Sequence, residues 1–276
     1  MKNTPASQFL TLSALLRDSY APRSEGRFSF RGHLLDRPMV NRREIRLCPH
    51  CILEDHDREG ALGRYGRSYW QLTQFRTCPR HGTPITSLPA QRHALDFAPV
   101  VERSLESIRQ NAGAATVRQH GFESWLLHRL AGQRTDYWFD DLEISVVAQF
   151  CEKVGIALCF GGATAPGQLE DGQLAIATET AFQRLAARTT GVEPLFREIW
   201  TKSCSTRAGY YATFGHLWRW LDKVKADPRY ERILSKAADF VFSHQPIPAG
   251  TLLLGRECKQ RRCHSVNSAA AVISPT

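Results

Sequence analysis

Two residue pairs, each with two residues between its members, are the part of the sequence best suited to chemistry. Cys48 and Cys51 form the first pair, and Cys78 and His81 form the second after 26 intervening residues. Thiolate sulfur and imidazole nitrogen are ligands that zinc prefers, and two such pairs supply the four ligands of a tetrahedral site. A site closed by four protein ligands has no open position for water, so the pattern predicts one structural Zn²⁺ ion and no zinc catalysis.

Other interpretations of the same segment stay open. Cys48 and Cys51 alone would serve as a thiol–disulfide pair, which requires a reactive thiolate at a helix start. His50 or His56 would replace His81 as the fourth ligand. The matched second pair favours zinc on Cys48, Cys51, Cys78 and His81.

The remaining candidate groups are weaker. The spacing of Cys258, Cys263 and His264 is too uneven to predict a second zinc site. Carboxylates near the first pair and further along resemble a nuclease set, but such residues usually cap helices or face solvent; they are Glu54, Asp55, Asp57, Asp140, Asp141 and Glu143. The chain contains no phosphate-binding glycine motif and no G-x-S-x-G motif, so we predict that it is not an enzyme.

Charge is concentrated at the two ends of the chain. The 36 Lys and Arg residues exceed the 27 Asp and Glu residues, and the net charge of +9 divides into +5 for residues 1–50, +1 for 51–100, −4 for 101–200 and +7 for 201–276. Basic segments at both ends of a folded protein favour binding to a polyanion, although the same net charge also favours solubility. The basic residues that we predict to contact nucleic acid are Arg256, Lys259, Arg261 and Arg262.

Composition also limits the cellular compartments in which we expect this protein. Eight cysteines among 276 residues are too few for a disulfide scaffold, and no apolar run reaches the ~18 residues of a transmembrane helix. The apolar stretch 9–16 is too short for a signal peptide and lacks a small-residue cleavage site. We therefore expect a cytoplasmic protein that makes no use of a membrane.

Helical periodicity dominates from residue 121 onward. Apolar residues at spacings of three and four mark amphipathic helices, Gly155 is the expected end of the second, and Asp227 with Pro228 begins the last. The predicted helices cover residues 122–130, 146–154, 179–188, 195–202, 210–224 and 228–241. Residues 68–77 are rich in aromatic and β-prone side chains and predict a strand.

These patterns predict a mainly α protein with a small zinc-ribbon-like α/β module near the N-terminus and a partial helix-turn-helix at the C-terminus. Small residues over 265–272, followed by Ser274 and Pro275, are typical of the start of a helix-turn-helix. The expected divisions are 1–40, a short helix (9–17) and an Arg-rich lead-in; 41–92, the zinc-binding module; 93–120, a connector; 121–245, a helical domain; and 246–276, the basic segment with the start of the helix-turn-helix.

Three stretches of this sequence resemble the TniQ family of bacterial transposition proteins. They are RLCPHCILED from Arg46, YWQL from Tyr69 and CPRHG from Cys78, and they include the Glu-Asp and Tyr-Trp pairs as well as the expected ligands. The likeness is tight over about residues 40–90 and looser over residues 122–131. The resemblance implies a target-selection adaptor of a mobile genetic element. Such an adaptor joins a DNA-recognising element or guide complex to an AAA+ ATPase, which recruits the transposase for DNA recombination.

The same resemblance implies a zinc-stabilised module for protein contact and helix-turn-helix elements for DNA binding. This sequence differs from the family pattern because little precedes the zinc pairs, a second Cys-x-x-Cys is missing, and the chain ends inside the predicted helix-turn-helix. These differences are the ones expected of a copy truncated at both ends. The alternative function is a zinc-containing transcriptional regulator that binds DNA alone.

Overall fold

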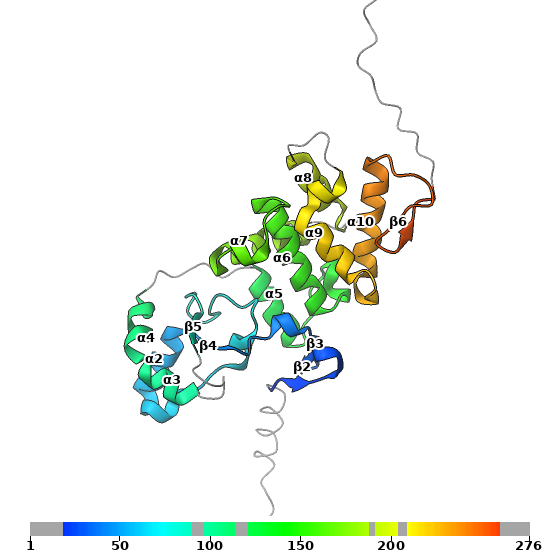
Figure 1. Cartoon of the computed structure of the whole chain (residues 1–276). Helices are drawn as coiled ribbons and strands as arrows, with labels where there is room; N and C mark the ends of the chain where they lie inside the picture. The colour runs from blue at the N-terminus through cyan, green and yellow to red at the C-terminus, as the bar shows by residue number, and fades with distance from the viewer. Residues whose placement is uncertain (1–18, 90–96, 114–120, 188–190, 204–208, 260–276) are drawn as a thin grey trace, which may run out of the picture.

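The chain buries its apolar side chains in two separate cores (Figure 1). The structure is a computed structural model that describes residues 19–89, 97–113, 121–187, 191–203 and 209–259. The smaller core surrounds the Cys/His pairs, and we call residues 44–112 the Cys/His module. The larger core lies among the helices that follow, which we call the helical body. Figure 1 shows the module at the lower left and the helical body to its right.

A two-stranded antiparallel sheet organises the Cys/His module. Strand β4 (Glu44–Leu47) pairs with β5 (Thr86–Pro89), and Leu47 lies opposite Thr86. This register places the residue after β4, Cys48, close to the residues that precede β5. The helical elements of the module are α2 (Pro49–Glu59), η3 (Gly60–Gly63), η4 (Ser68–Gln71), α3 (Phe97–Arg103) and α4 (Leu105–Ala112).

Residues within the segment expected to be a connector contribute to the smaller core. Val100 and Val101 on α3 and Ile108 on α4 are buried, and α4 packs against α2. Figure 1 shows α2, α3 and α4 grouped at one end of the molecule. Residues 97–112 therefore help to fix the position of α2, the helix that carries the first cysteine pair.

The helical body confirms the prediction of a mainly α protein. Its helices are α5 (Gly121–Leu130), α6 (Ile144–Phe160), α7 (Asp171–Ala186), α8 (Glu193–Lys202), α9 (Tyr210–Val224) and α10 (Glu231–His244). Short turns precede some of them, namely η5 (Trp138–Asp141), η6 (Pro166–Gln168) and η7 (Pro228–Tyr230). The hairpin of β6 (Leu252–Leu253) and β7 (Arg256–Glu257) follows α10.

A small N-terminal sheet packs on the helical body and shares its larger core with Leu72 and Phe75 of the Cys/His module. Strands β1 (Ala21–Pro22), β2 (Phe28–Phe30) and β3 (His33–Leu35) are antiparallel neighbours, and the turn η1 (Ser24–Gly26) joins the first two. Phe30 and Leu35 are fully buried in the larger core, and β3 contacts α6. The lead-in segment is therefore part of the folded protein. The turn η2 (Arg37–Met39) connects this sheet toward β4.

The prediction that Gly155 ends a helix is wrong, because α6 continues to Phe160. A Cβ atom added to Gly155 would lie 1.9 Å from the backbone oxygen of Ala177 on α7. The glycine therefore allows the backbones of α6 and α7 to approach closely, and its role is packing and not termination.

The predicted strand over residues 68–77 is also wrong, because the segment begins with the turn η4 and continues without a regular strand. The buried Arg46 guanidinium donates hydrogen bonds to three of its backbone carbonyls, those of Trp70 (3.0 Å), Leu72 and Phe75. A side chain distant in sequence thus satisfies carbonyls that a neighbouring strand would otherwise bond.

Two buried carboxylates hold the first turn of α5. Glu179 accepts hydrogen bonds from the backbone N–H groups of Gly121 (3.0 Å) and Phe122 (2.9 Å). Glu123 accepts from the N–H groups of Arg76 (2.7 Å) and Thr77 (3.1 Å), which precede Cys78. Glu123 therefore joins the Cys/His module to the helical body by direct hydrogen bonds.

Some predictions lie outside the residues that the structure describes, namely the short helix over 9–17 and the partial helix-turn-helix after residue 260. In the ranges that are described, no helix combines the length and apolarity needed to cross a bilayer.

Candidate metal centre

The first cysteine pair lies at the junction of a strand and a helix. Cys48 follows β4 and is the N-cap of α2, Pro49 occupies the first helical position, and Cys51 lies in the first turn. Proline is favoured at this position because its fixed φ suits the helix. The N–H group that proline lacks would have no hydrogen-bond partner within the helix at this position. The exposed N–H groups of a helix start also favour thiolate over thiol.

The second pair lies on a tight turn between the module's two strands. The N–H of Gly82 donates to the carbonyl of Cys78 (2.8 Å), and the N–H of Cys78 donates to the carbonyl of Thr83 (2.8 Å). Gly82 has a φ of +65°, a left-handed conformation that glycine adopts without strain. This turn directs Cys78 and His81 toward the start of α2.

The four side chains converge on one point. The Nδ1 atom of His81 lies 3.5 Å from the Sγ of Cys48, 3.4 Å from that of Cys51 and 3.7 Å from that of Cys78. The Cys51 and Cys78 sulfurs are 3.8 Å apart, and all four ligand atoms lie within 4.8 Å of one another. The three cysteines are buried, so the group is shielded from water.

These distances fit a tetrahedral zinc site. Zinc–sulfur bonds of about 2.3 Å and zinc–nitrogen bonds of about 2.0 Å place neighbouring sulfurs about 3.8 Å apart, and sulfur and nitrogen about 3.5 Å apart. The observed separations agree with both values. The chemistry of the donor set and its spacing therefore both suit a metal ion held by Cys48, Cys51, Cys78 and His81.

The three thiols influence one another's ionisation. Hydrogen bonds from Cys51 and Cys78 hold the pKa of Cys48 below its ordinary value. The same interactions with Cys48 raise the pKa of Cys51 and of Cys78. The Thr83 hydroxyl, 3.3 Å from the Cys48 sulfur, also stabilises its thiolate.

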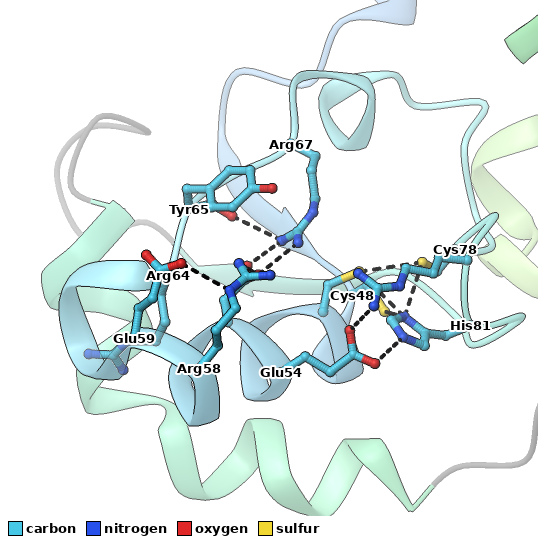
Figure 2. Close-up of polar contacts among 12 residues, drawn as sticks. Cys48, Glu54, Arg58, Glu59, Arg64, Tyr65, Arg67, Cys78 and His81 are labelled. Atoms are coloured by element: carbon cyan, nitrogen blue, oxygen red, sulfur yellow. Dashed lines mark hydrogen bonds and ion pairs between the residues drawn. The ribbon is translucent and has the colours of Figure 1, made fainter.

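The Glu54 carboxylate contacts the ring nitrogen of His81 that does not face the sulfurs (Figure 2). Its Oε1 accepts a hydrogen bond from the Nε2 of His81 (2.9 Å), and its Oε2 pairs with Arg80 (2.9 Å). Because Nδ1 faces the three sulfurs, the ring proton belongs on Nε2, where the carboxylate accepts it. A carboxylate in this position fixes the tautomer and orientation of a metal-binding histidine.

Asp55, the residue after Glu54, has a different role. Its buried carboxylate forms a bidentate ion pair with Arg67 (2.7 and 3.0 Å) and a single-contact ion pair with Arg58 (3.2 Å). The Arg67 guanidinium also lies over the rings of Tyr65 (4.3 Å) and Trp70 (4.8 Å). Asp55 thus fastens α2 to the segment that leads to the second pair.

The sequence contained a signal for Glu54 that the predictions did not use. Glu54 lies three residues after Cys51, and residues at this spacing share one face of a helix. That spacing alone would have placed a carboxylate beside the ligand set. The Glu-Asp pair of the family-like segment therefore consists of Glu54, which orients His81, and Asp55, which anchors α2.

The other candidate residues have other surroundings. His50 and His56 do not belong to the group formed by the four converging side chains, and Cys48 and Cys51 are free thiols. Asp140, one of the nuclease-like carboxylates, accepts a hydrogen bond from the Trp125 indole (2.8 Å) and pairs with Arg129 (3.3 Å) inside the helical body.

The predicted nucleic-acid residues are only partly within the described structure. Arg256 lies on β7, where it pairs with Asp239 (3.3 Å). Lys259 is exposed near the end of the described residues, while Arg261 and Arg262 lie outside them, as do Cys263 and His264. Cys258 is buried, and its N–H donates to the carbonyl of Thr251 (2.9 Å).

Comparison with known proteins agrees with this geometry. Residues 3–85 match the model of the TniQ family. This part of the chain is similar to the TniQ family. The match contains the complete Cys/His group. It also extends over β1, β2 and β3, which precede residue 41, the start predicted from the sequence for the zinc-binding module. The TniQ family is involved in DNA transposition. Comparison with curated proteins and with solved structures gave no match.

Proposed function

We propose that this chain is a non-enzymatic, zinc-containing adaptor for DNA transposition. It helps to select the target site and links DNA or a guide complex to an AAA+ transposition ATPase, which in turn recruits the transposase machinery. The observation that carries the proposal is the match of residues 3–85 to the TniQ family, because it covers the buried Cys/His group.

The metal has a structural role in this proposal. Four protein ligands leave no open position for a substrate or a water, so the ion supplies folding free energy and not chemistry. The Cys/His module has a small core, and the metal, when bound, joins the start of α2 to the turn before β5. The residues of the Cys/His module then hold the surface that would contact a partner in a single conformation.

Metal analysis of the purified protein tests the first part of the proposal. We expect about one zinc ion per chain, and we expect Cys78→Ser to lose it. Cys159→Ser is the matched control, because Cys159 is exposed on α6, is not one of the four converging side chains, and should not affect the zinc content. A native protein that is folded and free of metal would contradict a structural zinc site.

Partner binding tests the second part. An AAA+ ATPase encoded beside this chain should bind the native protein and the Cys159→Ser control, and should bind Cys78→Ser more weakly. Sequence-selective DNA binding by the isolated chain, with no affinity for such an ATPase, would favour the alternative of a transcriptional regulator acting alone.

A further inference from the structure

We propose that the N-terminal sheet binds the phosphate backbone of duplex DNA through four arginines, Arg23, Arg37, Arg42 and Arg43. We call these four residues the arginine face. The choice of DNA as the polyanion rests on the proposed function, whereas the existence and position of the face rest on the structure alone. This surface is distinct from the basic C-terminal residues predicted from the sequence.

Three of the four arginines gather at one end of the sheet. The N–H of Arg23 donates to the carbonyl of Arg27 (2.9 Å) across the turn between β1 and β2. In the same turn, a Cβ added to Gly26 would lie 3.9 Å from the Cδ of Arg37. The guanidinium of Arg42 lies 5.4 Å from the ring centroid of Phe28, the first residue of β2. Arg43 follows Arg42 directly in the chain and is also exposed.

The charges of the arginine face are not neutralised. All four residues are exposed, and none of them forms an ion pair with any residue in the described ranges. Two nearby carboxylates are engaged with other partners, because Glu25 pairs with Arg27 and Asp36 pairs with Arg229 (3.0 Å); Glu44, next to Arg43, is exposed and forms no ion pair in the described residues. Four exposed, unpaired cations in one place are the electrostatic footprint of a phosphate-binding surface.

The surface is held on a rigid support. Phe28 and Phe30 on β2 and Leu35 on β3 are buried in the larger core. Asp36, directly after β3, accepts a hydrogen bond from Gln149 on α6 (2.6 Å) in addition to its pair with Arg229. The position of Arg42 over Phe28 also restricts its side chain, and a guanidinium can bind two phosphate oxygens at once.

The composition of this face favours a polyanion over a protein. Protein interfaces have an apolar centre, whereas contacts to phosphates need only cations and hydrogen-bond donors. In the described residues 19–47, Leu34 is the one large apolar side chain that is exposed. The C-terminal candidate Arg256 is less suited to phosphate, because it pairs with Asp239 and is followed by Glu257.

The salt dependence of DNA binding by the full chain provides the test. We would titrate a labelled duplex of random sequence with purified protein at several salt concentrations. Each phosphate contact contributes about −0.9 to the slope of log K against log salt, so four contacts contribute about −3.6. The quadruple variant R23Q/R37Q/R42Q/R43Q should bind more weakly and lose most of that slope.

A matched control removes the same charge elsewhere. The variant R109Q/R134Q/R197Q/R232Q replaces four exposed arginines that already have carboxylate partners, and its affinity and slope should stay near the native values. Replacing the arginine face by lysines should retain most of the binding. The double variant R37Q/R43Q keeps the Arg42–Phe28 contact and serves if the quadruple variant does not fold, with about half the change in slope expected.

Several results would overturn the proposal: native protein that does not bind the duplex, equal losses in the two quadruple variants, or an unchanged slope in R37Q/R43Q. A quadruple variant that binds DNA normally but loses the ATPase would assign the face to a protein partner instead. ATPase binding is measured separately, so the two proposals can fail independently. A reduced slope without any ATPase binding would support the arginine face and contradict the adaptor.

Discussion

Removing the Glu54 carboxylate should weaken metal binding without changing a metal ligand. The bond from Nε2 of His81 to Glu54 is 2.9 Å long and charge-assisted, and such bonds contribute about 1.5–3 kcal/mol. The Glu54 side chain is 44% exposed, so we take the low end of this range, which corresponds to about a tenfold loss of zinc affinity for Glu54→Ala. Glu54→Gln keeps a neutral acceptor, so its loss should be about threefold.

Competition with a chromophoric chelator would give the zinc affinity of each variant. Glu59→Gln is the matched control, because Glu59 lies on the same helix, is exposed, and pairs with Arg58 and not with a residue of the metal site. A ¹⁵N correlation spectrum of the His81 ring adds a readout of the tautomer, which should stay Nε2-protonated in the native protein and become less uniform in Glu54→Ala. Equal zinc affinities for Glu54→Ala and Glu59→Gln would refute the positioning role of Glu54.

Two further predictions concern the helical body. Gly155→Ala should destabilise the protein by about 1–3 kcal/mol in denaturant unfolding, because the added Cβ would meet the Ala177 carbonyl at 1.9 Å. Gly172→Ala, with nothing within 4 Å of the added atom, should be neutral or stabilising; equal effects would contradict the close approach of α6 and α7. Burial raises the pKa of Glu123 from 4.5 to about 7, so the folded state binds this proton more tightly than the unfolded state, and stability falls as the pH rises between these values. From about pH 5 to about pH 8 the native protein should therefore lose up to about 3 kcal/mol relative to Glu123→Gln, a comparison in which the metal contribution cancels; parallel stability curves for the two proteins would contradict it.

The convergence of the four Cys/His side chains and the positions of the helices were predictable because their signals are local. The spacing of Cys48 and Cys51, and of Cys78 and His81, requires only a helix start and a tight turn to bring each pair to one point. The apolar stripe over residues 210–224 likewise predicts α9 with both of its bounds correct. Periodicity within one segment contains enough information for features of this kind.

Features that depend on distant partners were not predictable in the same way. Gly155 resembles a helix stop in sequence, and only the position of α7 shows that it permits a close crossing. The segment after residue 68 has strand-forming residues, yet the guanidinium of Arg46 bonds its carbonyls and takes the place of a neighbouring strand. No local sequence pattern predicts that Arg46 will be buried beside this segment.

The N-terminal sheet was missed because its strands are too short for periodicity to detect. β1 has two residues and β2 and β3 have three each, whereas alternation becomes visible over about four to eight. The surrounding arginines also made the segment look like a polar lead-in. In the structure, exposed arginines lie in the turns and segments that flank these strands, whereas Phe28, Phe30 and Leu35 of the strands are buried in the larger core.

X-ray absorption spectroscopy at the zinc edge of the purified protein tests the central claim most directly. If Cys48, Cys51, Cys78 and His81 hold one zinc ion, the first coordination shell contains three sulfurs at about 2.3 Å and one nitrogen at about 2.0 Å. A shell of four sulfurs, a shell dominated by oxygen and nitrogen, or folded protein without zinc would contradict the account.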